Sequence, residues 1–227
     1  MKKTTFVALL ILSNQCVADT LSNTLQSIES EWAAIYYKIP KAKQSNAYQK
    51  LLNKAALLEK QHPNAAEPIF WEAVIKATYA DNQSAISALS LVNEAKDLLQ
   101  KAIAINPNTM DGSAYVTLGT LYYMVPKWPI AFGDEGKAKH LLETALKINP
   151  RGIDSNYYYG DFLVSVDRPD EAKKYFENAI NAPSRPEQVF ADSQLKAEAQ
   201  KALNKIQGSE ASKNVIASFT HSSHARY

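Results

Sequence analysis

Cysteine and glycine are both scarce in this sequence. The single cysteine, Cys16, cannot form a disulfide within the chain. Only 7 of the 227 residues are glycine, and neither a Gly-x-Ser-x-Gly nor a Gly-x-Gly-x-x-Gly motif occurs. Hydrolases with a nucleophile elbow and enzymes with a dinucleotide-binding turn are therefore excluded. We predict no catalytic site, no metal site and no cofactor.

Long apolar runs are also missing. The apolar run near the N-terminus, residues 6–12, is far shorter than the roughly 20 residues that cross a bilayer. It follows Lys2 and Lys3 and precedes the small residue Ala18, which is the arrangement of a secretory signal peptide. We predict that residues 1–18 are a signal peptide, that the mature chain starts at Asp19, and that the protein is periplasmic.

A second interpretation concerns Cys16, which would anchor the protein to a membrane if it were acylated. Residues 13–15 before it, Ser-Asn-Gln, are more polar and bulkier than the small residues that usually precede a lipidated cysteine. We therefore expect no stable membrane insertion after cleavage. Lipid anchoring through Cys16 is the alternative.

Charge of one sign does not dominate either. Without Lys2 and Lys3 the mature chain has 23 basic residues against 23 acidic ones. Proteins that bind nucleic acid neutralise phosphates with an excess of Lys and Arg, so we do not expect a nucleic-acid partner.

The strongest positive signal is a repeated segment. Three stretches have Ala, Lys, two large residues and Ala at the same positions, and they are residues 95–102, 138–145 and 172–179. Their spacing places the first Ala, the second large residue and the last Ala on one face of a helix. The second and third stretches start 34 residues apart, the length of a tetratricopeptide (TPR) repeat. The first and second start 43 residues apart, which implies an insertion.

Small residues precede these stretches at matching places. Gly160 lies 12 residues before the third stretch, and Gly119 and Ala73 occupy the equivalent positions in the two preceding repeats. Glycine within a helix costs about 1 kcal/mol relative to alanine, so its use at two equivalent positions indicates a packing reason. We expect the two helices of each hairpin to approach closely there.

The pattern predicts an all-α fold, a TPR-like right-handed solenoid of four helix hairpins and a C-terminal capping helix. This domain spans residues 19–206, and its first pair of helices covers 21–38 and 42–61. The capping helix covers 187–206. Residues 207–227 are rich in Ser, Thr and His without a helical period, and we predict a disordered tail there.

Two motifs carry a narrower resemblance. Trp-Pro-x-x-Phe-Gly-Asp starts at Trp128, and Gly-Ile-Asp-x-Asn-Tyr starts at Gly152. With them the chain resembles the TatT component family, whose members are periplasmic TPR proteins linked to TRAP transporters. Two segments around Arg185 and Asp192 also fit. The resemblance implies docking on a periplasmic substrate-binding protein and assistance in delivering an organic acid or an apolar ligand. The chain departs from the family in lacking a convincing lipidation motif.

The register of the repeats predicts which residues form a binding surface. The first helix of each hairpin lines the concave face of such a fold, and its outward positions form an apolar groove edged by aromatic residues. A groove of this kind suits an extended peptide, an amphipathic helix or an apolar small molecule. The predicted groove residues are Phe70, Val74, Val116, Thr120, Tyr123, Tyr157 and Asp161. The alternative is that some of them pack internally or are covered by the inserted loop or another subunit.

The inserted loop is the second candidate. Trp128 could contact a partner or fold back onto the helices, and we expect Phe132 to fold back. The leading hypothesis is an adaptor that binds a protein partner. The alternative is a carrier of a small apolar or organic-acid ligand, held in the groove or in an intersubunit channel. Homo-oligomers are compatible with both.

Overall fold

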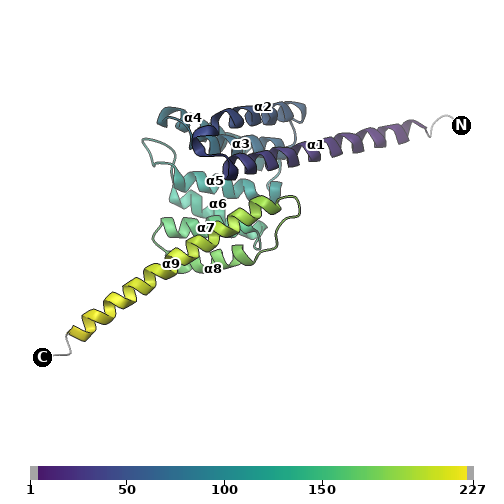
Figure 1. The fold of residues 1–227 in the computed structure, drawn as a ribbon. Coiled ribbons are helices and arrows are strands. Elements are labelled where there is room, and N and C mark those ends of the chain that lie inside the picture. The colour runs from purple at the N-terminus through teal and green to yellow at the C-terminus, as the bar shows by residue number, and fades with distance from the viewer. Residues whose placement is uncertain (1–4, 224–227) are drawn as a thin grey trace. The chain divides into compact units, whose positions relative to one another are not determined.

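The computed structural model describes the backbone of residues 5–223 and the side chains of residues 20–209. Within these ranges the chain is helical and has no extended strand, which confirms the predicted all-α helical repeat fold (Figure 1). The helices are α1 (Thr5–Lys38), α2 (Ser45–Gln61), α3 (Ala66–Ala80), α4 (Ala85–Ile105), α5 (Ser113–Met124), α6 (Glu135–Ile148), α7 (Ile153–Ser165), α8 (Pro169–Asn181) and α9 (Val189–Ser223). Two short 3-10 helices, η1 (Lys41–Lys43) and η2 (Thr109–Gly112), lie between them.

The chain divides into two compact units. Unit 1 is Met1–Met110 and contains α1 to α4, and unit 2 is Asp111–Tyr227 and contains α5 to α9. Consecutive helices pack as pairs, α1 with α2 and α3 with α4 in unit 1, and α5 with α6 and α7 with α8 in unit 2. In unit 2, α7 also packs beside α5 and α9. The four predicted helix pairs and the final helix are therefore present.

The repeated stretches form the core faces of α4, α6 and α8. Their first Ala, second large residue and last Ala are all fully buried, namely Ala95, Leu99, Ala102, Ala138, Leu142, Ala145, Ala172, Phe176 and Ala179. A Cβ built on Gly119 would lie 2.8 Å from Cγ of Leu142, and one built on Gly160 would lie 2.9 Å from Cε1 of Phe176. The expected close approach within each hairpin is confirmed at both glycines.

Caps fix where the helices begin and end. The Asp134 carboxylate accepts a hydrogen bond from the backbone N–H of Lys137 at 3.0 Å and so caps the start of α6. Asn106 and Asn149 cap the ends of α4 and α6, and a proline follows each of them. Proline cannot continue a helix, so the chain turns there toward the next hairpin.

The structure differs from the expectation at the C-terminal end. Helix α9 continues to Ser223, whereas we predicted that it ends at Ile206 and that a disordered tail follows. The physical reason is the absence of a terminator, because the sequence has no proline after Pro186 and no glycine after Gly208. The last four residues lie outside the described range.

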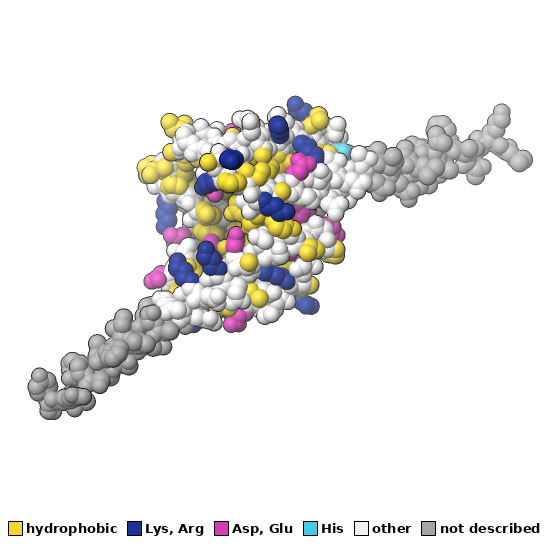
Figure 2. Space-filling model, in the orientation of Figure 1, with side chains coloured by type: hydrophobic (Ala, Val, Ile, Leu, Met, Phe, Trp, Pro, Cys, Tyr) yellow, Lys and Arg dark blue, Asp and Glu magenta, His cyan; other side chains and the backbone are white. Residues whose placement is uncertain are grey.

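The N-terminal predictions remain untested. The side chains of residues 1–19, including Cys16, lie outside the described part of the chain, so the signal peptide and the lipid anchor stay predictions. In the described part, no helix combines enough length with enough hydropathy to span a bilayer. On the face seen in Figure 2, basic and acidic side chains both occur between hydrophobic ones.

Candidate functional site

Three neighbouring helices of unit 2 bring together a polar and aromatic cluster. Helices α5 and α7 are the first helices of their hairpins, and α7 packs beside both α5 and α9. We call the half-buried side chains that they contribute the α5–α7–α9 cluster, and its members are Thr120, Tyr123, Tyr157, Asp161 and Glu198. Four of these five were predicted as binding residues.

Tyr123 and Asp161 are the centre of the cluster. The hydroxyl of Tyr123 donates a hydrogen bond to Oδ2 of Asp161 at 2.6 Å, although the two residues are 38 positions apart. The Tyr123 ring packs edge-on against Phe162, with ring centroids 5.7 Å apart. Burial raises the pKa of Tyr123 well above its ordinary value, and the charge of Asp161 and the hydrogen bond to it add to the rise. Tyr123 therefore remains a protonated donor in any physiological solution.

Tyr157 and Glu198 extend the cluster toward α9. The Tyr157 ring lies edge-on to Tyr158, at 5.0 Å between centroids, and 5.9 Å from the ring of Phe176. Burial raises the pKa of Glu198, a hydrogen bond with Tyr157 opposes the rise, and the charge of Asp161 adds to it. The two carboxyl groups, Asp161 and Glu198, therefore influence each other electrostatically.

Sequence reasoning missed Glu198. It precedes the fully buried Ala199 in the helix that we interpreted only as a cap. A signal was present, because Glu198 lies 37 residues after Asp161, which is one repeat length plus about one helical turn. Treating α9 as the first helix of a further repeat would have placed Glu198 near the concave positions of α5 and α7.

The apolar part of the predicted groove is not open. Phe70, Val74 and Val116 are only 4%, 8% and 3% exposed, so the alternative of internal packing is the one observed for them. Phe70, for example, packs edge-on against Trp71 at 5.4 Å. The prediction that these positions face outward was wrong. Burial of a bulky apolar side chain is more favourable in free energy than its exposure in a solvated groove. These positions therefore give no support to a carrier of apolar ligands.

Thr120 lies at the edge of the cluster. Its hydroxyl donates a hydrogen bond to the carbonyl of Val116 at 2.9 Å, one turn earlier in α5. This bond satisfies the hydroxyl within the helix, while the methyl group of Thr120 offers a small apolar contact.

The two aromatic residues of the inserted loop differ in how far they are buried. Phe132 is half-buried and lies edge-on to Tyr122, with 5.3 Å between ring centroids, as predicted. Trp128 is 85% exposed. An exposed tryptophan on a loop is a common feature of binding surfaces, since a partner can bury a large ring that does not pack against its own chain.

Among the described side chains, no group of three or more His, Cys, Asp or Glu residues is arranged to hold a metal ion. The cluster contains donors, acceptors and aromatic rings.

Comparison with solved structures agrees with this architecture. TTC0263, a thermophilic TPR protein of Thermus thermophilus, matches with a TM-score of 0.58 and 19% sequence identity, over 84% of this chain and 82% of that one. The chain has the fold of a tetratricopeptide repeat protein. Two structures of MamA match with TM-scores of 0.44 and 0.42, at 21% and 22% identity, over 77% and 82% of this chain and 95% of each MamA chain. No family model matches the sequence, and no curated protein matches it.

Proposed function

We propose that this protein is a non-enzymatic adaptor that docks a protein partner through the α5–α7–α9 cluster of its TPR fold. The observation that carries the proposal is the 2.6 Å hydrogen bond between Tyr123 and Asp161, which joins two consecutive repeats at predicted concave positions. A site assembled from several repeats and held in place by its own hydrogen bonds binds a partner at a low cost in conformational entropy.

The chemistry of the cluster favours a partner segment that carries lysine or arginine. Asp161 and Glu198 supply two carboxyl groups, and Tyr123 and Tyr157 supply aromatic rings next to them. A cationic side chain can form a charge-assisted hydrogen bond with a carboxylate and also contact a ring face. Exposed Trp128 adds a large apolar contact on the neighbouring loop.

For the identity of the partner we propose the periplasmic substrate-binding protein of a TRAP-type transporter. This step rests on the resemblance to the TatT component family in the Trp128–Asp134 and Gly152–Tyr157 motifs. It also requires export, which the N-terminal sequence predicts. The adaptor role through the cluster does not depend on this narrower identity.

The experiment is co-purification with cross-linking from the native periplasm, followed by a binding measurement with the purified partner. We expect Asp161→Asn and Tyr123→Phe each to weaken binding by about tenfold, because each removes one polar contribution while the ring and the volume remain. Tyr115→Phe on α5 and Asp167→Asn in the exposed turn that follows α7 are matched controls. Unchanged affinity in both cluster variants would show that the partner docks on another surface. A partner that is not a substrate-binding protein would contradict only the narrower identity.

A further inference from the structure

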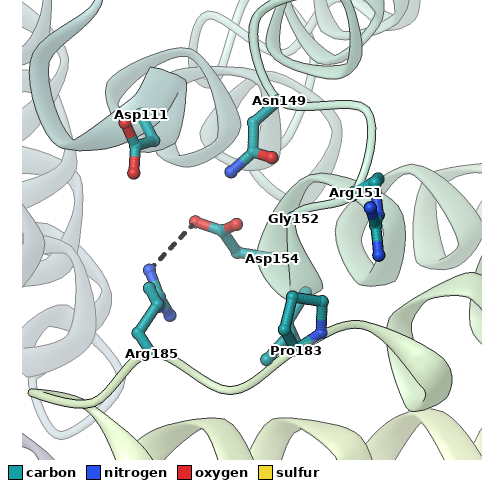
Figure 3. A pocket seen from close by; sticks show the side chains of 8 residues that line it. Asp111, Asn149, Arg151, Gly152, Asp154, Pro183 and Arg185 are labelled. Carbon is teal, nitrogen blue, oxygen red and sulfur yellow. Dashed lines mark ion pairs between the residues drawn. The ribbon is translucent and has the colours of Figure 1, made fainter.

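A separate cavity in unit 2 lies at the turn between α6 and α7, beside the connection from α8 to α9. Its volume is about 260 Å³, which is below the roughly 300–1,000 Å³ of pockets for drug-sized ligands. Figure 3 shows Asp111, Asp154 and Arg185 turned toward a common space. Arg151 lies at the side of the cavity opposite to Asp111 in this view. The lining residues are Asp111, Asn149, Arg151, Gly152, Ile153, Asp154, Pro183 and Arg185.

Internal hydrogen bonds hold the α6–α7 turn in place. The Ser155 hydroxyl donates to the carbonyl of Asn149 at 2.7 Å, and the Asn156 amide donates to the carbonyls of Pro150 and Gly152 at 3.0 and 2.8 Å. Ser155 and Asn156 are both buried. The turn is therefore a preformed wall of the cavity.

A second wall is held by an ion pair. The Arg185 guanidinium donates to both carboxylate oxygens of Asp192, with the shortest distance 2.5 Å, and the Arg185 backbone N–H donates to Oδ2 of Asp192 at 2.7 Å. Asp192 is fully buried. Arg185 also faces Asp154 at 4.0 Å, and Asp154 accepts a hydrogen bond from the Ser113 hydroxyl. These central charges are thus satisfied by each other.

Two charges at the rim are not satisfied in this way. Asp111 and Arg151 are exposed, and neither side chain forms a hydrogen bond or an ion pair with any described residue. The Asn149 side-chain amide between them is likewise without a partner in the described range. Asp111 has a left-handed backbone with φ 52°, an uncommon conformation for a residue other than glycine, so its position at the rim is set by the fold.

We propose that this cavity binds a small zwitterion, an amino acid whose ammonium and carboxylate are separated by a short carbon chain. Arg151 would hold the carboxylate, Asp111 the ammonium, and the Asn149 amide would contact either end. The two free charges have opposite signs and lie on opposite sides of the cavity, so a ligand with one charge would leave one of them unmatched. The proposal does not depend on the adaptor function, because none of these residues belongs to the α5–α7–α9 cluster.

The test is isothermal titration calorimetry of the full chain with 4-aminobutyrate, butyrate and butylamine, which share a four-carbon chain. We expect 4-aminobutyrate to bind at least tenfold more tightly than either of the singly charged compounds. Asp111→Asn should raise the Kd of 4-aminobutyrate about tenfold and bring it to that of butyrate. Arg151→Gln should raise the Kd of 4-aminobutyrate to the Kd of butylamine.

Both substitutions suit the fold, because asparagine tolerates a left-handed backbone and Arg151 is exposed. Glu177→Gln and Lys205→Gln change the same charges at exposed positions on α8 and α9 that do not line the cavity, and should leave the Kd unchanged. Butyrate binding as tightly as 4-aminobutyrate would overturn the proposal in favour of an anion site, and equal binding of butylamine would overturn it in favour of a cation site. Absence of binding by 4-aminobutyrate at roughly 10 mM, ten times the half-saturation of a millimolar site, would also overturn it.

Discussion

Gly160 on α7 lies directly against the ring of Phe176 on α8. A Cβ at Gly160 would come within 2.9 Å of Cε1 and 3.1 Å of Cδ1 of the ring, and Phe176 itself is fully buried in the core of its hairpin. An aromatic ring cannot bend away as a flexible side chain can, so the hairpin would have to open slightly to admit one methyl group.

We therefore expect Gly160→Ala to destabilise the protein. Alanine gains about 1 kcal/mol over glycine in helix propensity, but overpacking a core contact costs about 1–3 kcal/mol. The net loss should be up to about 2 kcal/mol in the free energy of unfolding, measured by chemical denaturation. Gly208→Ala in α9 is the control, because a Cβ there meets no described atom within 4 Å and should stabilise the helix. A stabilised Gly160→Ala variant would show that the hairpin has room to spare.

The same contact explains why the fold was predictable from sequence. The repeated Ala, large residue and Ala pattern defines a core face, and Gly160, 12 residues before the third stretch, marks where α7 approaches it. Both are local features that can be recognised in the sequence. The extension of α9 past Ile206 was not predictable in this way. It depends on the lack of a helix-terminating residue and not on a periodic pattern of apolar residues.

The candidate site was less predictable, because exposure depends on what each helix packs against. Tyr123 and Asp161 were found from the repeat register, but Val116 on the same face is buried. The members of the cavity come from two turns and a connection that no period links, so Asp111 could not be paired with Arg151 from sequence alone.

A buried carboxyl group in unit 1 should make stability depend on pH. Glu72 on α3 is 9% exposed, and burial and the nearby charge of Glu59 raise its pKa, while Lys76 at 3.4 Å opposes the rise. A carboxyl group with a raised pKa binds its proton more tightly in the folded state than in the unfolded state. Its contribution to stability is therefore full at pH values below the ordinary 4.5 and declines as the pH rises through the folded pKa.

Replacing Glu72 with Gln should remove this decline. We expect the free energy of unfolding of the wild type, measured by urea denaturation, to fall more between pH 4.5 and pH 7 than that of Glu72→Gln. The exposed Glu177→Gln variant should follow the wild type. Parallel pH profiles for the wild type and Glu72→Gln would mean that Glu72 stays ionised in the folded protein without penalty.

The pair of Arg185 and Asp192 should contribute substantially to the stability of unit 2. Asp192 is fully buried and accepts hydrogen bonds from both the side chain and the backbone of Arg185. Asp192→Ala leaves a guanidinium and a backbone N–H without their acceptor, and we expect a loss of about 2–4 kcal/mol in the free energy of unfolding. Asp97→Ala, which breaks the ion pair between the exposed Asp97 and the half-buried Lys96, should cost less than about 1 kcal/mol. Equal losses in the two variants would show that burial of Asp192 adds nothing.

Substitutions of Trp128 and Phe132 in the inserted loop should affect different properties, partner binding for Trp128 and stability for Phe132. Phe132 packs against Tyr122, so Phe132→Ala should lower the free energy of unfolding by about 1–2 kcal/mol, less than the roughly 3–5 kcal/mol of a fully buried phenylalanine. Trp128 is 85% exposed, and Trp128→Ala should change stability by less than about 0.5 kcal/mol. If Trp128 contacts the docked protein, the same substitution should weaken partner binding at least tenfold, because large aromatic side chains dominate interface energies. A Trp128→Ala variant that unfolds more easily than Phe132→Ala would instead assign Trp128 to the core, and the loop would then contribute no free aromatic ring to docking.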